Sequence, residues 1–239
     1  MKAYKTNLIL IFLLLGISPW AFSASAEMSS KHLRLVKDLM NNNLAYSQDA
    51  TTTNIIEWEE EIVDSLRQKK DYRNMFLMKQ MAVYAYSLQA KISEALKKAD
   101  AMMDEARLMK YNIGISLSYQ ALGDIYLNAG MRPEAVEEYE KAMKTLQATP
   151  HAEKIQERIF IQLVPTLIKL KRMDEAKAYL EHMSEICESK CLSPFLLYAY
   201  HAYYYLRNND LSKAREYIDE AIKINSRTPS HFYDNILKY

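Results

Sequence analysis

Glycine and proline are scarce in this sequence, with four Gly and six Pro among 239 residues. β-Sandwiches and β-barrels need many tight turns, and such turns draw heavily on these two residue types. Hydrophobic residues make up 49% and charged residues 26%, which is an ordinary balance for a globular protein. The shortage of turn formers therefore excludes a loop-rich all-β fold and favours helices with short connections.

Neither sign of charge dominates the sequence. Its 31 basic and 30 acidic residues give a formal charge of +1, and five or six like charges never occur in a row. A nucleic-acid or anionic-membrane partner is usually matched by a basic patch or run. The composition therefore points to neither of these partners.

Only one long apolar run is present, and it lies near the start of the sequence. This run, Leu8–Ile17, follows a short basic segment and precedes the small residues Ala24, Ser25 and Ala26. That order is typical of an export signal peptide, and the run is short for a membrane span. We therefore expect residues 1–26 to be cleaved off, which leaves a periplasmic chain without a membrane span. The alternative is an N-terminal anchor that is not cleaved.

Apolar residues recur at steps of three and four through the rest of the sequence. Ile55, Trp58, Ile62 and Leu66 fall on one face of a helix, and most of the acids at 57–61 fall outside it. Short breakers separate helical segments of about 15 residues, a spacing that predicts antiparallel helix pairs.

A pattern that extends over two helices occurs at residues 119–142. It is formed by Tyr119, Leu122, Gly123, Tyr126, Ala135, Tyr139 and Ala142. Gly123 lies within the first of two helices, where Gly costs about 1 kcal/mol relative to Ala, so it indicates a close approach of the second helix. Gly130 is placed to end the first helix in a left-handed conformation, and Pro133 suits the first turn of the second.

The same spacing pattern recurs along the chain with fewer matching residues. Its central alanines are Ala95, Ala135, Ala176 and Ala214, at spacings of 40, 41 and 38 residues. The pattern resembles the tetratricopeptide repeat, although the usual Trp and Phe are both Tyr here. Because a strict repeat has about 34 residues, we expect lengthened turns between repeats.

This resemblance implies an all-α fold, a tetratricopeptide-like α-solenoid of about five antiparallel helix pairs plus a C-terminal helix. The repeat domain would span residues 27–239, with a degenerate pair at 28–70, repeats at about 76–109, 116–149, 157–190 and 195–228, and a final helix at 229–239. The final helix would either cap the array or begin a further repeat. A compact helical bundle is the structural alternative.

An export signal followed by such repeats resembles exported periplasmic tetratricopeptide arrays and the periplasmic input regions of bacterial membrane sensors. In those sensors the array is followed by a membrane span and an output domain. This sequence shows neither, so the resemblance transfers no signalling activity to it.

Motifs for catalysis, cofactors and metals are missing from the sequence. The four glycines form no nucleotide-binding loop, and no two of the five histidines stand three or four residues apart. We expect His201 to be a packed, hydrogen-bonded core residue and the acids at 57–61 to form a solvated face. Of the tyrosine-rich stretch 198–205, only Tyr203 and Tyr204 are expected to be free. The sequence therefore predicts no cofactor, no metal and no enzymatic activity.

The sequence has only two cysteines, Cys187 and Cys191. In an exported chain two nearby thiols favour a disulfide. Because the geometry for bonding is poor within one intact helical turn, we expect the helix to break near residues 188–190. Free thiols are the alternative.

In tetratricopeptide families one face of each first helix lines a concave groove that holds peptides. Carried onto this sequence, the groove comprises Leu77, Gln80, Tyr84, Leu117, Gln120, Asp124, Asn128, Arg158, Ile161, Leu196, Ala199, Tyr203 and Arg207. The Lys/Asn pattern that clamps a peptide's terminal carboxylate in family members is absent here. Tyr84, Tyr203 and Arg207 are the favoured anchors, because Tyr and Arg are common at interface centres.

The leading hypothesis is a non-enzymatic periplasmic module that binds a protein or peptide in this groove. The alternative is the ligand-sensing input region of a bacterial signalling system whose membrane and output domains are absent from this chain. The sequence predicts neither the identity of the partner nor the oligomeric state.

Overall fold

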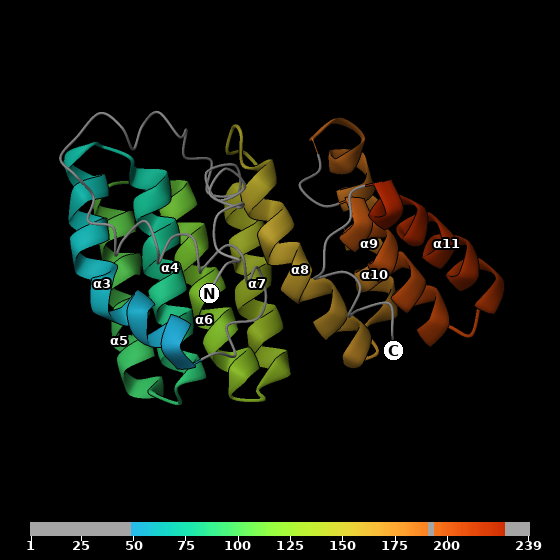
Figure 1. Ribbon diagram of the computed structural model, residues 1–239, viewed down its shortest axis with the longest axis horizontal. Coiled ribbons are helices and arrows are strands. Elements are labelled where there is room, and N and C mark those ends of the chain that lie inside the picture. The colour runs from blue at the N-terminus through green and yellow to red at the C-terminus, as the bar shows by residue number, and fades with distance from the viewer. Residues whose placement is uncertain (1–48, 191–193, 228–239) are drawn as a thin grey trace, which may run out of the picture. The chain divides into compact units, whose positions relative to one another are not determined.

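The computed structural model describes residues 49–190 and 194–227, and all regular structure in these ranges is α-helical (Figure 1). The helices are α3 (Asp49–Gln68), α4 (Tyr72–Leu88), α5 (Ile92–Leu108), α6 (Asn112–Asn128), α7 (Arg132–Leu146), α8 (Glu153–Lys169), α9 (Met173–Lys190), α10 (Pro194–Arg207) and α11 (Leu211–Arg227). The all-α solenoid class predicted from the sequence is confirmed, since consecutive helices pack in pairs. The predicted signal peptide, the first helix of the 28–70 pair and the final helix at 229–239 lie outside the described residues.

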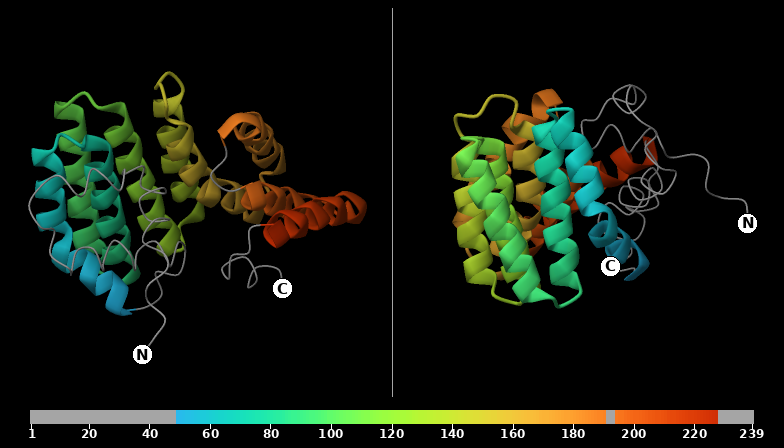
Figure 2. Two further views of the ribbon diagram at one scale, coloured as in Figure 1. Left: turned by 45° about the horizontal axis from the view of Figure 1, so that its top comes forward. Right: turned by 90° about the vertical axis from the view of Figure 1, so that its left-hand side faces the viewer.

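The chain divides into two compact units, and the boundary falls between Thr145 and Leu146. Unit 1 contains α3 to α7, and unit 2 contains α8 to α11. Within unit 1, α4 packs on α3, α5 and α6, and α5 also packs on α6. Within unit 2, α10 packs on α8, α9 and α11. Alternate helices such as α4 and α6 therefore lie side by side, as the further views in Figure 2 also show.

In the first two helix pairs the 40-residue period comes mainly from long helices. Helices α4, α5 and α6 have 17 residues each. The connection inside the first pair, 89–91, is as short as the connection between pairs, 109–111. Between the first and second pairs the expected lengthening of the turn is therefore absent, because the extra residues add to the helices. Between α7 and α8 the connection, 147–152, is longer, as expected.

Seven of the connections between helices share one backbone feature, a residue with positive φ. These residues are Lys70, Ala90, Lys110, Gly130, His151, Lys171 and Asn209. At the end of α4, Ala90 N–H donates to the Ser87 carbonyl and Lys91 N–H donates to the Tyr86 carbonyl, which satisfies two carbonyls that the helix end leaves over. The left-handed conformation predicted for Gly130 is confirmed by its φ of 79°.

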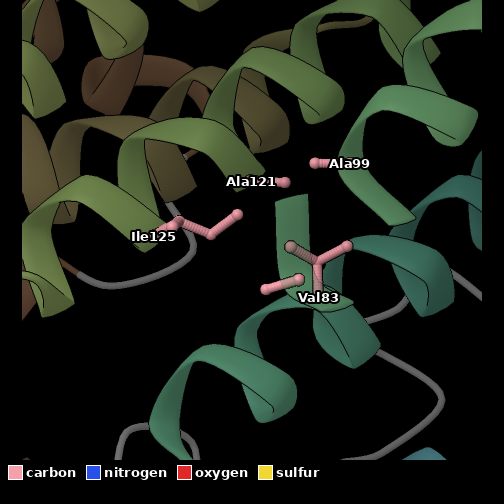
Figure 3. Close-up of a cluster of buried hydrophobic side chains, with 5 residues drawn as sticks. Val83, Ala99, Ala121 and Ile125 are labelled. Atoms are coloured by element: carbon pink, nitrogen blue, oxygen red, sulfur yellow. The ribbon is translucent and has the colours of Figure 1, made fainter. Parts of the chain in front are cut away.

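The core of each unit is built on small residues where helices cross. In unit 1, Val83 of α4, Ala99 of α5, and Ala121 and Ile125 of α6 form one buried cluster (Figure 3). The predicted central alanines Ala95, Ala135, Ala176 and Ala214 are at most 3% exposed. Small side chains at these positions let the helix backbones approach closely, as the repeat pattern predicts.

Gly123 shows how close this approach is. A Cβ atom at this position would lie 2.5 Å from Cε1 of Tyr139, whose ring is fully buried between α6 and α7. The sequence-based prediction of close helix packing at Gly123 is confirmed.

Unit 2 contains a proline inside a helix, and another helix compensates for it. Pro165 in α8 has no N–H to donate to the carbonyl of Ile161 four residues earlier. The Tyr200 hydroxyl of α10 donates to that same carbonyl at 3.1 Å, and its ring packs edge-on against Phe160. Tyr200 therefore links α10 to α8 at the Ile161 carbonyl, which has no donor within its own helix because of Pro165.

Three expectations about burial were wrong. Ile218, which the repeat spacing places on the core face of α11 with Ala214 and Ala221, is 39% exposed, whereas both alanines are buried. Tyr204 is only 6% exposed, because α10 is covered by helices on several sides. Glu59 is 7% exposed, because α5 supplies Lys98 as an ion-pair partner, so the acids at 57–61 are not all solvated.

Candidate functional site

The residues predicted to line a groove form a row along α4 and α6 in unit 1. Leu77, Gln80, Leu117, Gln120 and Asp124 are each 4% exposed or less. As groove residues, these side chains were expected on an open surface, but they are buried. The cause is the direct packing of α4 on α6, which covers the side chains that face the neighbouring helix.

The row becomes more exposed toward the C-terminal ends of both helices. Tyr84, one turn after Gln80 on α4, is half-buried, and Asn128, one turn after Asp124 on α6, is exposed. The Asn128 amide donates to Ser87 Oγ at 2.7 Å, which links α6 back to α4. Solvent therefore reaches the row at the end marked by Tyr84 and Asn128.

A buried hydrogen-bond network lies at the centre of the row. Asp124 accepts a hydrogen bond from Gln80 Nε2 at 2.6 Å and another from the Tyr139 hydroxyl at 2.7 Å. These bonds join α4, α6 and α7 through one carboxylate. Burial, and next the neighbouring Asp124 carboxylate, raise the pKa of Tyr139 well above 10.0, so its hydroxyl remains a donor at neutral pH.

Two amide oxygens in the row have no hydrogen-bond partner. They are Oε1 of Gln80 and Oε1 of Gln120, and both are buried from solvent. An unsatisfied buried acceptor costs about 1–3 kcal/mol. The row therefore holds acceptor groups that lack donors in the free chain.

In unit 2 the predicted groove positions have a different character. Arg158 of α8 and Tyr203 of α10 are partly buried, and Arg207 at the end of α10 is exposed. Of the others, Leu196 is buried, and Ile161 and Ala199 are partly buried. Most of the positions in unit 2 are thus apolar or aromatic.

Beside this row, α10 and α11 share a group of stacked rings. Tyr217 stacks on His201, with ring centres 4.6 Å apart, and on Tyr205 at 5.4 Å. Ser184 Oγ donates to the Leu180 carbonyl, so it accepts from His201 Nε2 at 3.1 Å. His201 is therefore a packed, hydrogen-bonded residue, as predicted. Since the Ser184 proton is directed at the backbone, this pair lacks the arrangement in which His activates Ser as a nucleophile.

Sequence reasoning missed an ion-pair network in unit 1. Glu105 of α5 pairs with Arg67 of α3 at 2.9 Å and with Lys79 of α4. Burial on its own would raise the pKa of Glu105, but the hydrogen bonds from Lys79 and Arg67 outweigh it and hold the pKa below 4.5. These residues are far apart in sequence, so no spacing rule would have found them.

The disulfide prediction is supported at Cys187, which is disulfide-bonded. Cys187 lies within α9, and Cys191 lies outside the described residues. Helix α9 continues to Lys190. The helix therefore ends at the last residue of the segment 188–190, near which the break was expected.

Within the described ranges, no three His, Cys, Asp or Glu side chains are grouped in a way that would hold a metal ion. No helix in the same ranges is long and apolar enough to cross a bilayer.

Comparison with known proteins places two of the helix pairs in a family. Residues 117–145 and 197–228 match the tetratricopeptide repeat. The first match falls on α6 and α7, and the second falls on α10 and α11. No curated protein is significantly similar to the chain. These two matches and the paired helices support a tetratricopeptide-repeat protein. Tetratricopeptide repeats generally mediate contacts between proteins.

Proposed function

We propose that this chain is an exported, non-enzymatic interaction module that binds a protein or peptide segment along the α4–α6 row. The observation that carries the proposal is the row itself. Its polar side chains are buried at the centre, and exposure increases toward the half-buried Tyr84 and the exposed Asn128. Tyr offers a large contact area with a polar tip, which suits the rim of an interface. The periplasmic location rests on the signal-like segment at residues 1–26.

The alternative function as the input region of a signalling system rests on sequence resemblance alone. Its partner would be a membrane-bound kinase or another output protein. Identifying the protein that contacts the α4–α6 row therefore also decides between the two functions.

Site-specific crosslinking tests the proposed interface. A photoreactive phenylalanine analogue is placed at Tyr84 or Asn128 in the full chain and activated in intact cells. The matched control places the same group at Lys97, which is exposed on α5. We expect one and the same protein to be crosslinked from both row positions and not from position 97. Equal crosslinking from position 97, or none from either row position, would contradict the proposal.

Asp124 is unsuitable for such a test. It accepts bonds from both Gln80 and Tyr139, so its removal would leave two buried donors without an acceptor and would destabilise unit 1. Tyr84 and Asn128 are better choices because they lie at the exposed end of the row.

Export is tested separately by the intact mass of protein recovered from the cell envelope. We expect a chain that begins at Glu27. Recovery of a chain that retains residues 2–26 would contradict signal cleavage.

A further inference from the structure

The unpartnered amide oxygens of Gln80 and Gln120 indicate what the row would bind. Each side chain is 4% exposed, and each Oε1 lacks a donor. Buried polar atoms in proteins nearly always have a hydrogen-bond partner. A missing partner at two positions of one row therefore suggests that the donors are supplied by another molecule.

Both side chains belong to one cluster of acceptors. Gln80 reaches Asp124 through its Nε2, so its Oε1 is the atom that remains. Gln120 lies one turn before Asp124 on the same face of α6. The cluster thus presents two amide oxygens beside a carboxylate, and the donors of Gln80 and Tyr139 are already used on that carboxylate.

Such a cluster disfavours an acidic ligand. A carboxylate has only acceptor atoms, so it would add to the unsatisfied acceptors and lie close to the Asp124 charge. A guanidinium group has five N–H donors in a planar fork, no acceptor, and a charge opposite to that of Asp124. An arginine side chain therefore matches the row in both hydrogen bonding and charge.

The geometry points to the α4–α6 row as a binding site for an arginine side chain of a partner segment, with Gln80 Oε1 and Gln120 Oε1 as acceptors. This inference rests on the proposed function and adds the chemistry of the partner. The side chain would enter at the more exposed end of the row, which is marked by Tyr84 and Asn128.

A peptide series tests the inference on the full chain. The probe is acetyl-Ala-Leu-Arg-Leu-Ala-amide, and its relatives carry citrulline, norleucine or glutamate in place of arginine. Affinity is measured by calorimetry, and the location of binding is measured from chemical shifts of α4 and α6. We expect the arginine peptide to bind at least about tenfold more tightly than the norleucine and glutamate peptides, as hydrogen bonds to charged groups allow. Citrulline keeps most of the donors but not the charge, so its affinity should be intermediate.

A variant tests the same point independently of the peptide series. Gln120→Met keeps the length of the side chain and removes the acceptor. We expect this variant to melt at a higher temperature than the native chain and to bind the arginine and norleucine peptides equally. Gln68→Met, at the exposed end of α3, is the matched control and should leave both properties unchanged.

The outcomes separate this inference from the proposed function. Binding at the row without preference for arginine would overturn the inference and leave the row as an interface. Absence of peptide binding, or binding with no shifts in α4 and α6, would also overturn it. The crosslinking from Tyr84 and Asn128 decides the proposed function whatever the peptide series shows.

Discussion

The two compact units use the same repeat positions for opposite purposes. Counted back from the central alanine of each pair, one position is Gln80 and Gln120 in unit 1 but Ile161 and Ala199 in unit 2. A second position is Tyr84 and Asp124 in unit 1 but Pro165 and Tyr203 in unit 2. Unit 1 therefore places amides and a carboxylate where unit 2 places mostly apolar and aromatic side chains.

This difference shows that neighbouring helices of the same scaffold are held together by different interactions in the two units. The polar row of unit 1 depends on directional hydrogen bonds, and each buried group must find a partner. The rings of unit 2, such as Tyr205 and Tyr217, pack with less demand on direction. We therefore expect unit 2 to tolerate substitutions at these positions better than unit 1.

The largest expected effect is in unit 1, at the close approach of α6 and α7. Gly123→Ala would place a Cβ 2.5 Å from Cε1 of the buried Tyr139 ring. We expect a loss of about 2 kcal/mol in the free energy of unfolding, since overpacking outweighs the gain in helix propensity. Urea denaturation followed by circular dichroism measures this loss.

A second substitution identifies the cause of that loss. In a Tyr139→Leu background the ring is gone, so adding Gly123→Ala should cost little or nothing further. If Gly123→Ala costs the same in both backgrounds, the ring is not the source of the clash.

The next largest effect is expected in unit 2, where Tyr200 compensates for Pro165. Tyr200→Phe keeps the ring against Phe160 and removes the hydroxyl that donates to the Ile161 carbonyl. We expect it to cost about 1 kcal/mol, the usual net value of one hydrogen bond. In a Pro165→Ala background the helix supplies its own donor to that carbonyl, so the cost should fall by about half or more. An equal cost in both backgrounds would show that the two residues are not coupled.

The sequence predicts well those features that depend on local pattern. The helix pairs, the small residues at crossings and the left-handed Gly130 all follow from spacing and from the conformational freedom of Gly. Ile218 was misassigned because the apolar stripe on α11 is broader than the face that α10 covers. Spacing alone does not tell which edge of such a stripe is buried.

The candidate site was predicted only in part. The row of positions followed from the resemblance to the repeat family, but the burial of Gln80, Gln120 and Asp124 did not. Whether a polar side chain is covered depends on how closely α4 lies against α6, and the sequence pattern does not encode that distance. The hydroxyl of Tyr139, in place of the usual Phe, was the one signal that pointed to a buried acceptor nearby.

Effects of equal or smaller size are expected in the turns, where the residue type differs although the conformation is shared. Ala90 has φ 57° and Gly130 has φ 79°, and only Gly adopts this region without strain. We expect Ala90→Gly to stabilise the chain by about 0.5 kcal/mol and Gly130→Ala to destabilise it by about 1 kcal/mol. Thermal denaturation measures both changes, as a higher melting temperature for Ala90→Gly and a lower one for Gly130→Ala. The control is Ala101→Gly on the exposed side of α5, which should destabilise, because Gly inside a helix is unfavourable. Stabilisation by Ala101→Gly, or destabilisation by Ala90→Gly, would contradict this account.

The smallest effect concerns the pH at which each unit loses stability. Burial lowers the pKa of His201 below 6.5, and the neighbouring Glu181 offsets only part of that effect. Protonation therefore favours the unfolded chain, and the stability that neutral His201 contributes is lost as the pH falls below about 6.5. In unit 1 the pKa of Glu105 is held below 4.5, so its contribution persists until the pH falls below about 4.5.

Between pH 7 and pH 5.5, unit 2 should thus loosen before unit 1. Hydrogen exchange of backbone amides, corrected for the intrinsic pH dependence, reports the opening of each unit separately. We expect the protection of α10 and α11 to fall over this range while that of α4 and α6 is unchanged. His201→Phe keeps a ring to stack on Tyr217 and should abolish the fall. His182→Gln, at an exposed position in α9, should leave the fall in place. A parallel fall in both units, or a fall that survives His201→Phe, would mean that buried His201 is not what makes unit 2 the more pH-sensitive of the two.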